Sequence, residues 1–164
     1  MCSGAVSLPV EAALERASGL CAARGVRFTT LRQRVFALVC EAERPVGAYD
    51  LLERLADADD RRAQPPTVYR ALDFLQSQGL IHRLASNNTY LACVHPEEGH
   101  ASVFLVCRHC GRASELESAA VDAAIGELAG QSGFSVEHSV MELAGLCELC
   151  RGHRHRPASA GAGA

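Results

Sequence analysis

Two pairs of cysteines, each with the spacing Cys-x-x-Cys, are the residues of this sequence best placed to do chemistry. Cys107 and Cys110 form the first pair, and Cys147 and Cys150 form the second. Two short turns of this kind can present four thiolates to one ion, which completes the tetrahedral coordination of a structural zinc site. The alternative is four reduced cysteines packed in a core, but the repeated spacing favours zinc.

The separation of the two pairs predicts what the zinc would hold together. Between Cys110 and Cys147 lie 36 residues, more than the roughly 15–20 of an ordinary zinc ribbon. Apolar patterning predicts a small α/β unit here, with strands over 102–106, 112–116 and 134–143 and a helix over 118–130. A unit of roughly 60 residues is marginal on core burial alone, so a structural ion could decide whether it folds.

The other cysteines and the composition indicate a globular chain in a reducing compartment. Cys2, Cys21 and Cys40 have no partner at a metal-binding spacing, so we expect them to be terminal or packed as small apolar residues. The first residues form no basic and apolar leader, which predicts a cytoplasmic protein with reduced thiols. The 164 residues are 48% hydrophobic and 21% charged, as in one soluble domain or two small ones. No apolar run approaches the roughly 18 residues of a membrane span, so we expect no membrane partner.

Charge is distributed unevenly along the chain, although the formal net charge is only −3. Up to residue 92 there are 11 arginines and 10 acidic residues, and from residue 93 there are 5 arginines and 9 acidic residues. Arg24, Arg27 and Arg32 lie in a stretch without acidic residues between Arg16 and Glu41. Such a cluster of arginines is typical of a surface that contacts nucleic-acid phosphates, but it is equally typical of an ordinary solvated helix face. Charge alone does not decide between these two alternatives.

The first 93 residues have the element order of a winged helix-turn-helix. Periodicity and end signals predict helices over 7–24, 30–42, 48–56 and 65–78, the second opened by a capping box of Thr30 and Gln33. Two apolar runs, 80–84 and 89–93, are joined by Ser86-Asn87-Asn88 and predict a β-hairpin, the wing. The predicted class is therefore α+β: an N-terminal winged helix-turn-helix domain plus a small C-terminal α/β domain.

The start of the fourth predicted helix carries residues suited to reading DNA, because this end faces base edges in the major groove. Thr67 lies near the helix cap, and Tyr69 and Arg70 follow it. Arg70 is the best candidate for a bidentate contact to guanine. For Tyr69, packing and a phosphate contact both stay open.

Four stretches of the sequence resemble the ferric uptake regulator (Fur) family, and most of all its zinc uptake regulator (Zur) branch: PPTVYRALDFLQSQGLIHRL, NNTYLAC, CRHC and CELC. The resemblance runs from about Ala12 to Cys150. It implies a homodimeric transcriptional repressor that binds operator DNA with metal as corepressor. We expect a DNA-binding domain over 1–91, a dimerisation and metal-binding domain over 92–152 and a disordered tail over 153–164. Tyr49 matches a tyrosine that the family uses at the DNA.

The resemblance also implies a second, regulatory zinc site, and so two Zn²⁺ per subunit. The residues that match the Zur-like sensing site come from the wing, the hinge after it and the later strands: His82, Cys93, His100 and Glu115. A thiolate among these ligands suits Zn²⁺, whereas iron and manganese favour harder ligands. The dense His-His-Asp-His run of iron-sensing relatives is largely missing before Cys107. A third metal site at His95 or His138 stays open.

Three alternatives compete with zinc-dependent repression. Within the family, the chain could sense iron, manganese or peroxide instead. Zinc sites also occur in enzymes, but the deaminase signature, a glycine-rich phosphate loop and a nucleophile elbow are all absent from the sequence. A zinc module that binds only proteins would leave the helix over 65–78 unexplained. We therefore expect double-stranded DNA and a second copy of the chain as partners, with neither catalysis nor a small-molecule substrate.

Overall fold

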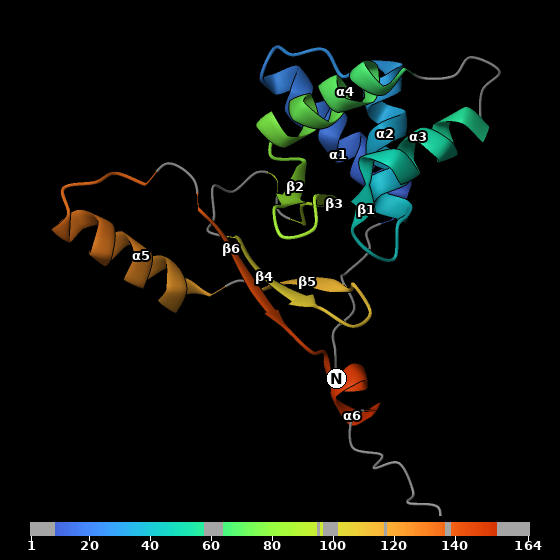
Figure 1. The fold of residues 1–164 in the computed structure, drawn as a ribbon. Helices are drawn as coiled ribbons and strands as arrows, with labels where there is room; N and C mark the ends of the chain where they lie inside the picture. The colour runs from blue at the N-terminus through green and yellow to red at the C-terminus, as the bar shows by residue number, and fades with distance from the viewer. Residues whose placement is uncertain are drawn as a thin grey trace, which may run out of the picture.

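The computed structural model describes residues 9–57, 64–94, 96, 102–116, 118–136 and 139–153. Figure 1 shows a helical unit with a small hairpin beneath it, and below the hairpin a second sheet from which an arm with one helix projects. This arrangement confirms the predicted α+β class, with an N-terminal winged helix-turn-helix unit and a C-terminal α/β unit.

Four helices build the N-terminal unit: α1 (Val10–Ala23), α2 (Thr30–Glu41), α3 (Ala48–Asp57) and α4 (Pro65–Ser77). Their inward positions carry fully buried apolar side chains, among them Val35, Leu51, Val68, Leu72 and Leu75. Gly25 and Gly79 follow α1 and α4 with φ angles of 66° and 67°, a left-handed conformation that glycine adopts without strain. Within the described ranges, no helix has the length and apolar character that a membrane span needs.

The start of α2 differs from the predicted capping box. The N-cap residue is Thr29, and its side chain makes no capping hydrogen bond. Gln33 donates from Nε2 to the carbonyl oxygen of Phe28 at 2.9 Å. The capping-box prediction is wrong because Thr30 already lies inside the helix, one residue beyond the position from which a side chain caps the free N–H groups.

The wing is a three-stranded sheet in the order β1-β3-β2, formed by β1 (Val46–Gly47), β2 (Ile81–Leu84) and β3 (Thr89–Ala92). The predicted hairpin of β2 and β3 is confirmed, and Asn88 in its turn has a φ of 55°. β1 was not predicted, since the sequence indicates only a break between helices there. A strand of two residues is too short to show alternation, so periodicity cannot detect it.

The second sheet has the order β5-β4-β6, formed by β4 (Ser102–Cys107), β5 (Ala113–Leu116) and β6 (Val140–Gly145). β4 runs antiparallel to β5 and parallel to β6. The last strand begins later than predicted, at Val140, because Val140 makes the first pair with the start of β4. The sequence also did not predict the short helix α6 (Glu148–His153) that follows β6.

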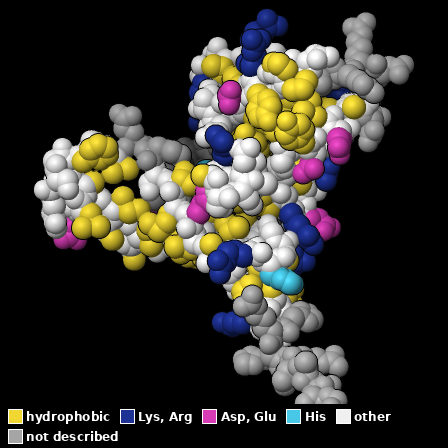
Figure 2. Space-filling view, viewed as in Figure 1, with side chains coloured by type: hydrophobic (Ala, Val, Ile, Leu, Met, Phe, Trp, Pro, Cys, Tyr) yellow, Lys and Arg dark blue, Asp and Glu magenta, His cyan; other side chains and the backbone are white. Residues whose placement is uncertain are grey.

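Helix α5 (Ala119–Gln131) forms the arm seen in Figure 1, and strand β6 lies at the edge of the second sheet, from which the arm projects. No residue of α5 is buried, and Figure 2 shows hydrophobic side chains along the arm. The large exposed ones in and around these two elements are Leu128, Phe134, Val136, Val140, Met141 and Leu143. This much exposed apolar surface in one region is typical of an interaction site.

A small apolar cluster joins the wing to the second sheet. Leu84 of β2 packs with Phe104 and Val106 of β4, and Leu91 of β3 lies against them. Because side chains alternate along a strand, His82 shares with Leu84 the face of β2 that is directed at this sheet. The cluster therefore brings the two units close enough for residues of both to form one site.

Candidate metal centres and nucleic-acid interface

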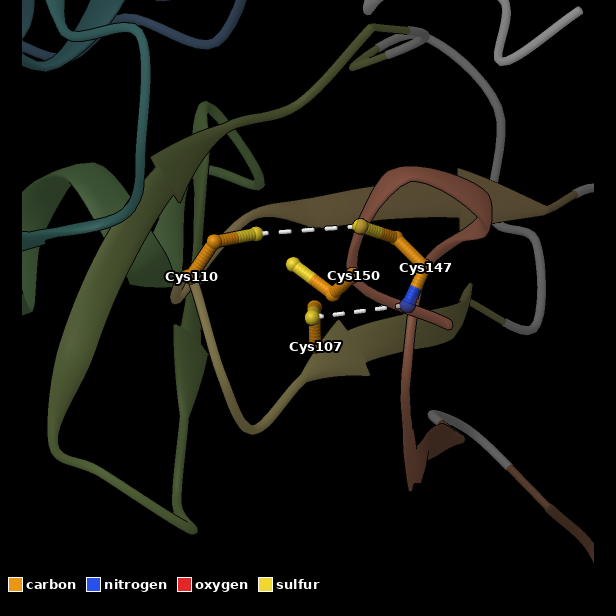
Figure 3. A group of neighbouring side chains, drawn as sticks. All are labelled: Cys107, Cys110, Cys147 and Cys150. Atoms are coloured by element: carbon orange, nitrogen blue, oxygen red, sulfur yellow. Dashed lines mark hydrogen bonds between the residues drawn. The ribbon is translucent and has the colours of Figure 1, made fainter. Parts of the chain in front are cut away.

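Four cysteines from two turns converge on one point (Figure 3). Cys107 ends β4 and Cys110 lies in the turn after it, whereas Cys147 precedes α6 and Cys150 lies within α6. The four Sγ atoms lie within 4.8 Å of one another, and those of Cys110 and Cys147 are 3.8 Å apart. Tetrahedral zinc with Zn–S bonds of about 2.3 Å requires sulfur–sulfur distances of about 3.8 Å. The four side chains therefore fit the predicted structural Zn²⁺.

Backbone hydrogen bonds shape the turns that present these sulfurs. In the first turn, Gly111 donates to the carbonyl oxygen of Cys107 at 2.9 Å and has a φ of 72°. The N–H of Cys107 in turn donates to the carbonyl oxygen of Arg112 at 2.8 Å. In the second turn, Arg151 donates to the carbonyl oxygen of Cys147 at 2.8 Å. The main chain thus orients the thiols toward one another.

The thiols of this centre differ in acidity. The backbone N–H of Cys147 donates to Sγ of Cys107 at 3.4 Å. This bond, with a second from the backbone of Cys110, lowers the pKa of Cys107 to about 5. Burial, and after it the neighbouring cysteine side chains, raises the pKa of Cys150 to about 12. Because zinc binds thiolates, loading this centre must remove protons from the thiols that still carry them.

Zinc affinity of the four-cysteine centre should fall as the pH falls, because zinc binds thiolates and protons compete for them. The fall should become steeper below about pH 5, where Cys107, with a pKa of about 5, is protonated as well. Metal analysis of the zinc-loaded Cys93→Ser variant, dialysed against a chelator at a series of decreasing pH values, checks this. A zinc content that is the same at every pH would contradict thiolate coordination by this centre.

A second group of side chains that could hold a metal ion lies between the wing and the second sheet. His82 of β2, Cys93 just after β3 and Glu115 of β5 each offer one ligand atom, and these atoms lie within 4.8 Å of one another. Nε2 of His82 is 3.7 Å from Oε1 of Glu115, and both side chains are nearly buried. An imidazole, a thiol and a carboxylate fit Zn²⁺, which takes N, S and O ligands at about 2.0–2.3 Å. The predicted fourth ligand, His100, lies outside the described residues.

Three separate elements position these ligands. The ring of His82 packs against that of Phe104, with centroids 5.0 Å apart. The N–H of Cys93 donates to the carbonyl oxygen of Leu80 at 3.0 Å, which ties the hinge to the segment between α4 and β2. Glu115 pairs with Phe104 across β5 and β4, so that both side chains share the face directed at the wing. The group of His82, Cys93 and Glu115 therefore links the wing and its helical unit to the second sheet. His95 and His138, considered for a third site, lie outside the described residues.

The predicted DNA-reading residues lie on the exposed surface of the helical unit. Thr67, Tyr69 and Arg70 are in the first two turns of α4, and Tyr69 is 36% exposed. Tyr49, at the start of α3, is 75% exposed. Since so exposed a ring contributes little to the core, Tyr49 is available to contact a partner. DNA contacts by these four residues stay predictions.

The arginines predicted to meet phosphates also make contacts within the chain. Arg24 donates to the carbonyl oxygens of Gln78, at the end of α4, and Pro96, after the hinge, at 2.5 and 3.3 Å. Arg32 donates to the carbonyl oxygen of Arg27, and its guanidinium also stacks on the ring of Phe74 in α4. Sequence reasoning missed the bridging role of Arg24, because its partners lie 54 and 72 residues away. Phosphate contacts by these three arginines stay predictions.

Comparison with known proteins identifies the family. The model of the Ferric uptake regulator family matches residues 23–144. The zinc uptake regulation protein of Escherichia coli (strain K12) is 40% identical over 138 residues, which cover 84% of this chain and 80% of that protein. The chain therefore belongs to the ferric uptake regulator family.

Solved structures of zinc uptake regulators share the fold. A zinc uptake regulator complexed with zinc and DNA is 37% identical, with a TM-score of 0.82 over 90% of this chain and 98% of that chain. The holo form of XcZur is 39% identical, with a TM-score of 0.75 over 85% of this chain and 96% of that chain. The apo form of XcZur covers 87% of this chain and 97% of that chain, but its TM-score is only 0.52. This chain therefore resembles the holo form more closely than the apo form.

Proposed function

We propose that this chain is a zinc-responsive transcriptional repressor, which binds operator DNA as a homodimer with Zn²⁺ as corepressor and controls zinc uptake and homeostasis genes. The centre of His82, Cys93 and Glu115 carries the proposal, because its ligands come from the wing, the hinge and the second sheet. The relatives support it, since one is a zinc uptake regulation protein and another is a zinc uptake regulator complexed with zinc and DNA. The thiol of Cys93 favours zinc over iron or manganese as the sensed metal.

The second centre can act as a clamp between the two units. A bound Zn²⁺ would supply the positive charge that draws thiolate, carboxylate and imidazole to bonding distance. His82 then holds β2, and Cys93 holds the hinge, against Glu115 on the second sheet. Because α4 leads into β2 through a short turn at Gly79, fixing β2 also fixes the direction of α4. In the clamped form of the dimer, both α4 helices are held in the orientation that fits the operator. To raise the fraction of dimers in this form from about 1% to about 99%, zinc must bind it more favourably than the unclamped form by about 5.5 kcal/mol.

The partner that we propose for the apolar arm is a second copy of the chain. Helix α5 has 13 residues and none of them is buried, and an isolated helix of this length is only marginally stable in water. A second copy that covers α5 and β6 would shield their exposed side chains, such as Phe134 and Leu143. The resulting dimer would present two α4 helices to two half-sites of an operator, and zinc would set their separation.

We further propose that each subunit binds two Zn²⁺ with different roles. The four-cysteine centre has no open position, which is typical of structural zinc, and it holds α6 to the turn between β4 and β5. The second centre is the exchangeable, regulatory one. We assign the DNA-binding domain to residues 1–91 and the dimerisation and metal-binding domain to residues 92–152. Free thiols in both domains suit the reducing cytoplasm.

Replacing Arg70 with alanine should weaken operator binding by about 5- to 150-fold, because a bidentate arginine–guanine contact contributes roughly 1–3 kcal/mol of discrimination. The loss should be largest on the operator with the original guanine and smaller on an operator with that base changed. Arg44→Ala is the matched control, since it removes the same charge from an exposed position after α2. Fluorescence anisotropy of the wild-type chain and both variants on both operators gives the six affinities. An equal loss on both would mean that Arg70 contacts phosphate and does not read a base.

Operator binding with and without zinc tests the proposed function. Fluorescence anisotropy with a palindromic AT-rich duplex should show tight binding with zinc and a large loss after chelation of the exchangeable ion. An enzyme or a protein-binding zinc module would show no zinc-dependent DNA binding in this experiment. Tight binding that chelation leaves unchanged would contradict zinc as corepressor.

A further inference from the structure

A carboxylate outside both metal centres also joins the wing to the second sheet. Glu142 of β6 accepts a hydrogen bond from the N–H of Ala85 on Oε1 at 2.5 Å, and one from the N–H of Ser86 on Oε2 at 3.2 Å. Both donors belong to the turn between β2 and β3 of the wing. Each carboxylate oxygen thus holds one backbone amide of the wing turn.

The register of the second sheet makes Glu142 part of a row that faces the wing. Phe104 of β4 pairs with Glu115 of β5 on one side and with Glu142 of β6 on the other. Residues paired across neighbouring strands project on the same face. At one end of the row Glu115 approaches His82, at the other end Glu142 holds the wing turn, and Phe104 is fully buried between them. The wing is therefore attached at two points, and only one of them needs metal.

The surroundings of Glu142 suit a charged acceptor. Burial alone would raise the pKa of Glu142, but hydrogen bonds from Ser86 and Ala85 outweigh burial and lower this pKa. An ionised carboxylate has only acceptor sites and so matches two N–H donors. Hydrogen bonds to a charged group are also about twice as strong as those between neutral groups.

We propose that Glu142 is a positioning residue that docks the wing turn on the second sheet without metal, and thereby sets the zinc concentration at which the repressor switches. The inference rests on the proposed function, because it concerns the same switch. Without this contact the zinc ligands are unchanged, but the wing samples more orientations and a smaller fraction of chains has the ligands together. The apparent zinc affinity of the regulatory centre falls in proportion to that fraction.

The test compares two Glu142 variants with the wild-type chain. Glu142→Gln keeps one oxygen acceptor and turns an NH₂ donor toward the other wing amide, whereas Glu142→Ala removes both acceptors. Glu15→Gln is the matched control, since it removes the same charge from an exposed position of α1. Operator binding is measured by fluorescence anisotropy across a series of buffered free Zn²⁺ concentrations.

We expect the half-maximal free Zn²⁺ concentration to rise about 10-fold for Glu142→Gln, as for the loss of one hydrogen bond to a charged group, and further for Glu142→Ala. Operator affinity at saturating zinc and the zinc content should stay at wild-type values, and Glu15→Gln should behave as wild type. An unchanged midpoint in both Glu142 variants would overturn the inference. So would a loss of binding that is equal at every zinc concentration, because that result indicates a folding defect.

Hydrogen–deuterium exchange separates this inference from the proposed function, because it needs no DNA. The wing amides of Ala85 and Ser86 should exchange faster in Glu142→Ala than in the wild-type chain, with or without zinc. Equal exchange rates would overturn the inference even if zinc controls DNA binding. If the wild-type chain shows no zinc-dependent operator binding, the proposed function fails, and faster exchange in the variant would still support the docking contact.

Discussion

Replacing Cys93 with serine should abolish zinc-dependent operator binding and leave a folded dimer. A serine hydroxyl stays protonated at neutral pH, so it cannot replace the thiolate in a zinc site. The backbone bond from Cys93 to the carbonyl oxygen of Leu80 does not involve the side chain, so the hinge should keep its path. Loss of residues that only support metal ligands already costs about 10- to 100-fold in metal affinity. For a ligand itself we expect operator binding about 100-fold weaker or more, at zinc levels that saturate the wild-type chain.

Cys40→Ala is the matched control for Cys93→Ser. Cys40 lies in α2, packed against the helical core, and burial raises the pKa of its thiol to about 12. It is therefore protonated at neutral pH and offers no thiolate to a metal. Gel shift measures the zinc response of both variants, and size-exclusion chromatography measures their assembly. A Cys93→Ser chain with a wild-type zinc response would show that Cys93 is not a ligand of the regulatory centre.

Loss of the four-cysteine centre should unfold the C-terminal unit and leave the helical unit folded. Cys110→Ser removes a thiolate that lies 3.8 Å from Sγ of Cys147. Apparent binding free energies of structural zinc are about 10–16 kcal/mol, whereas a unit of about 60 residues gains only about 3–5 kcal/mol from its own core. The helical unit has a larger apolar cluster of its own, built around Val35, Leu51 and Leu72.

Metal analysis and hydrogen–deuterium exchange measure the effect of Cys110→Ser. We expect the variant to lose the tightly held zinc and the dimer, and to lose amide protection in β4 and β6. Protection in α2 should persist, and Cys40→Ala again serves as control. A Cys110→Ser chain that retains its zinc, its dimer and its protected strands would show that this centre does not stabilise the fold.

The four-cysteine centre could be predicted from the sequence because each half of it is local. Two cysteines three positions apart in a tight turn project toward the same side, as Cys107 and Cys110 do beside Gly111. Only the meeting of the two turns depends on the tertiary fold. The helices could be predicted for the same reason, because apolar periodicity is also a local property.

The proposed regulatory centre could not be derived from residue spacing. His82, Cys93 and Glu115 lie on a strand, a hinge and a strand of another sheet, and no local pattern connects them. These three residues could be predicted as zinc ligands only from the resemblance to the family. In the structure, the packing of Leu84 against Phe104 brings the two sheets together and with them the ligands.

Other long-range contacts had no signal in the sequence at all. The partners of Glu142 are backbone amides 56 and 57 residues away. Because nearly every residue has a backbone N–H, the residue types do not show which amides a side chain will contact. The same holds for Arg24, whose carbonyl partners lie at the end of α4 and after the hinge. Strand β1 likewise exists only because β3 offers it an edge to pair with.

Zinc at His82, Cys93 and Glu115 is the proposed switch for DNA binding, and operator binding at buffered free Zn²⁺, Fe²⁺ and Mn²⁺ tests this proposal most directly. The starting material is the wild-type chain with its tightly held zinc in place. Operator binding should appear as one further zinc per chain is taken up, and should not appear with iron or manganese. A response to iron or manganese alone, or full operator binding before the second zinc is bound, would contradict the account.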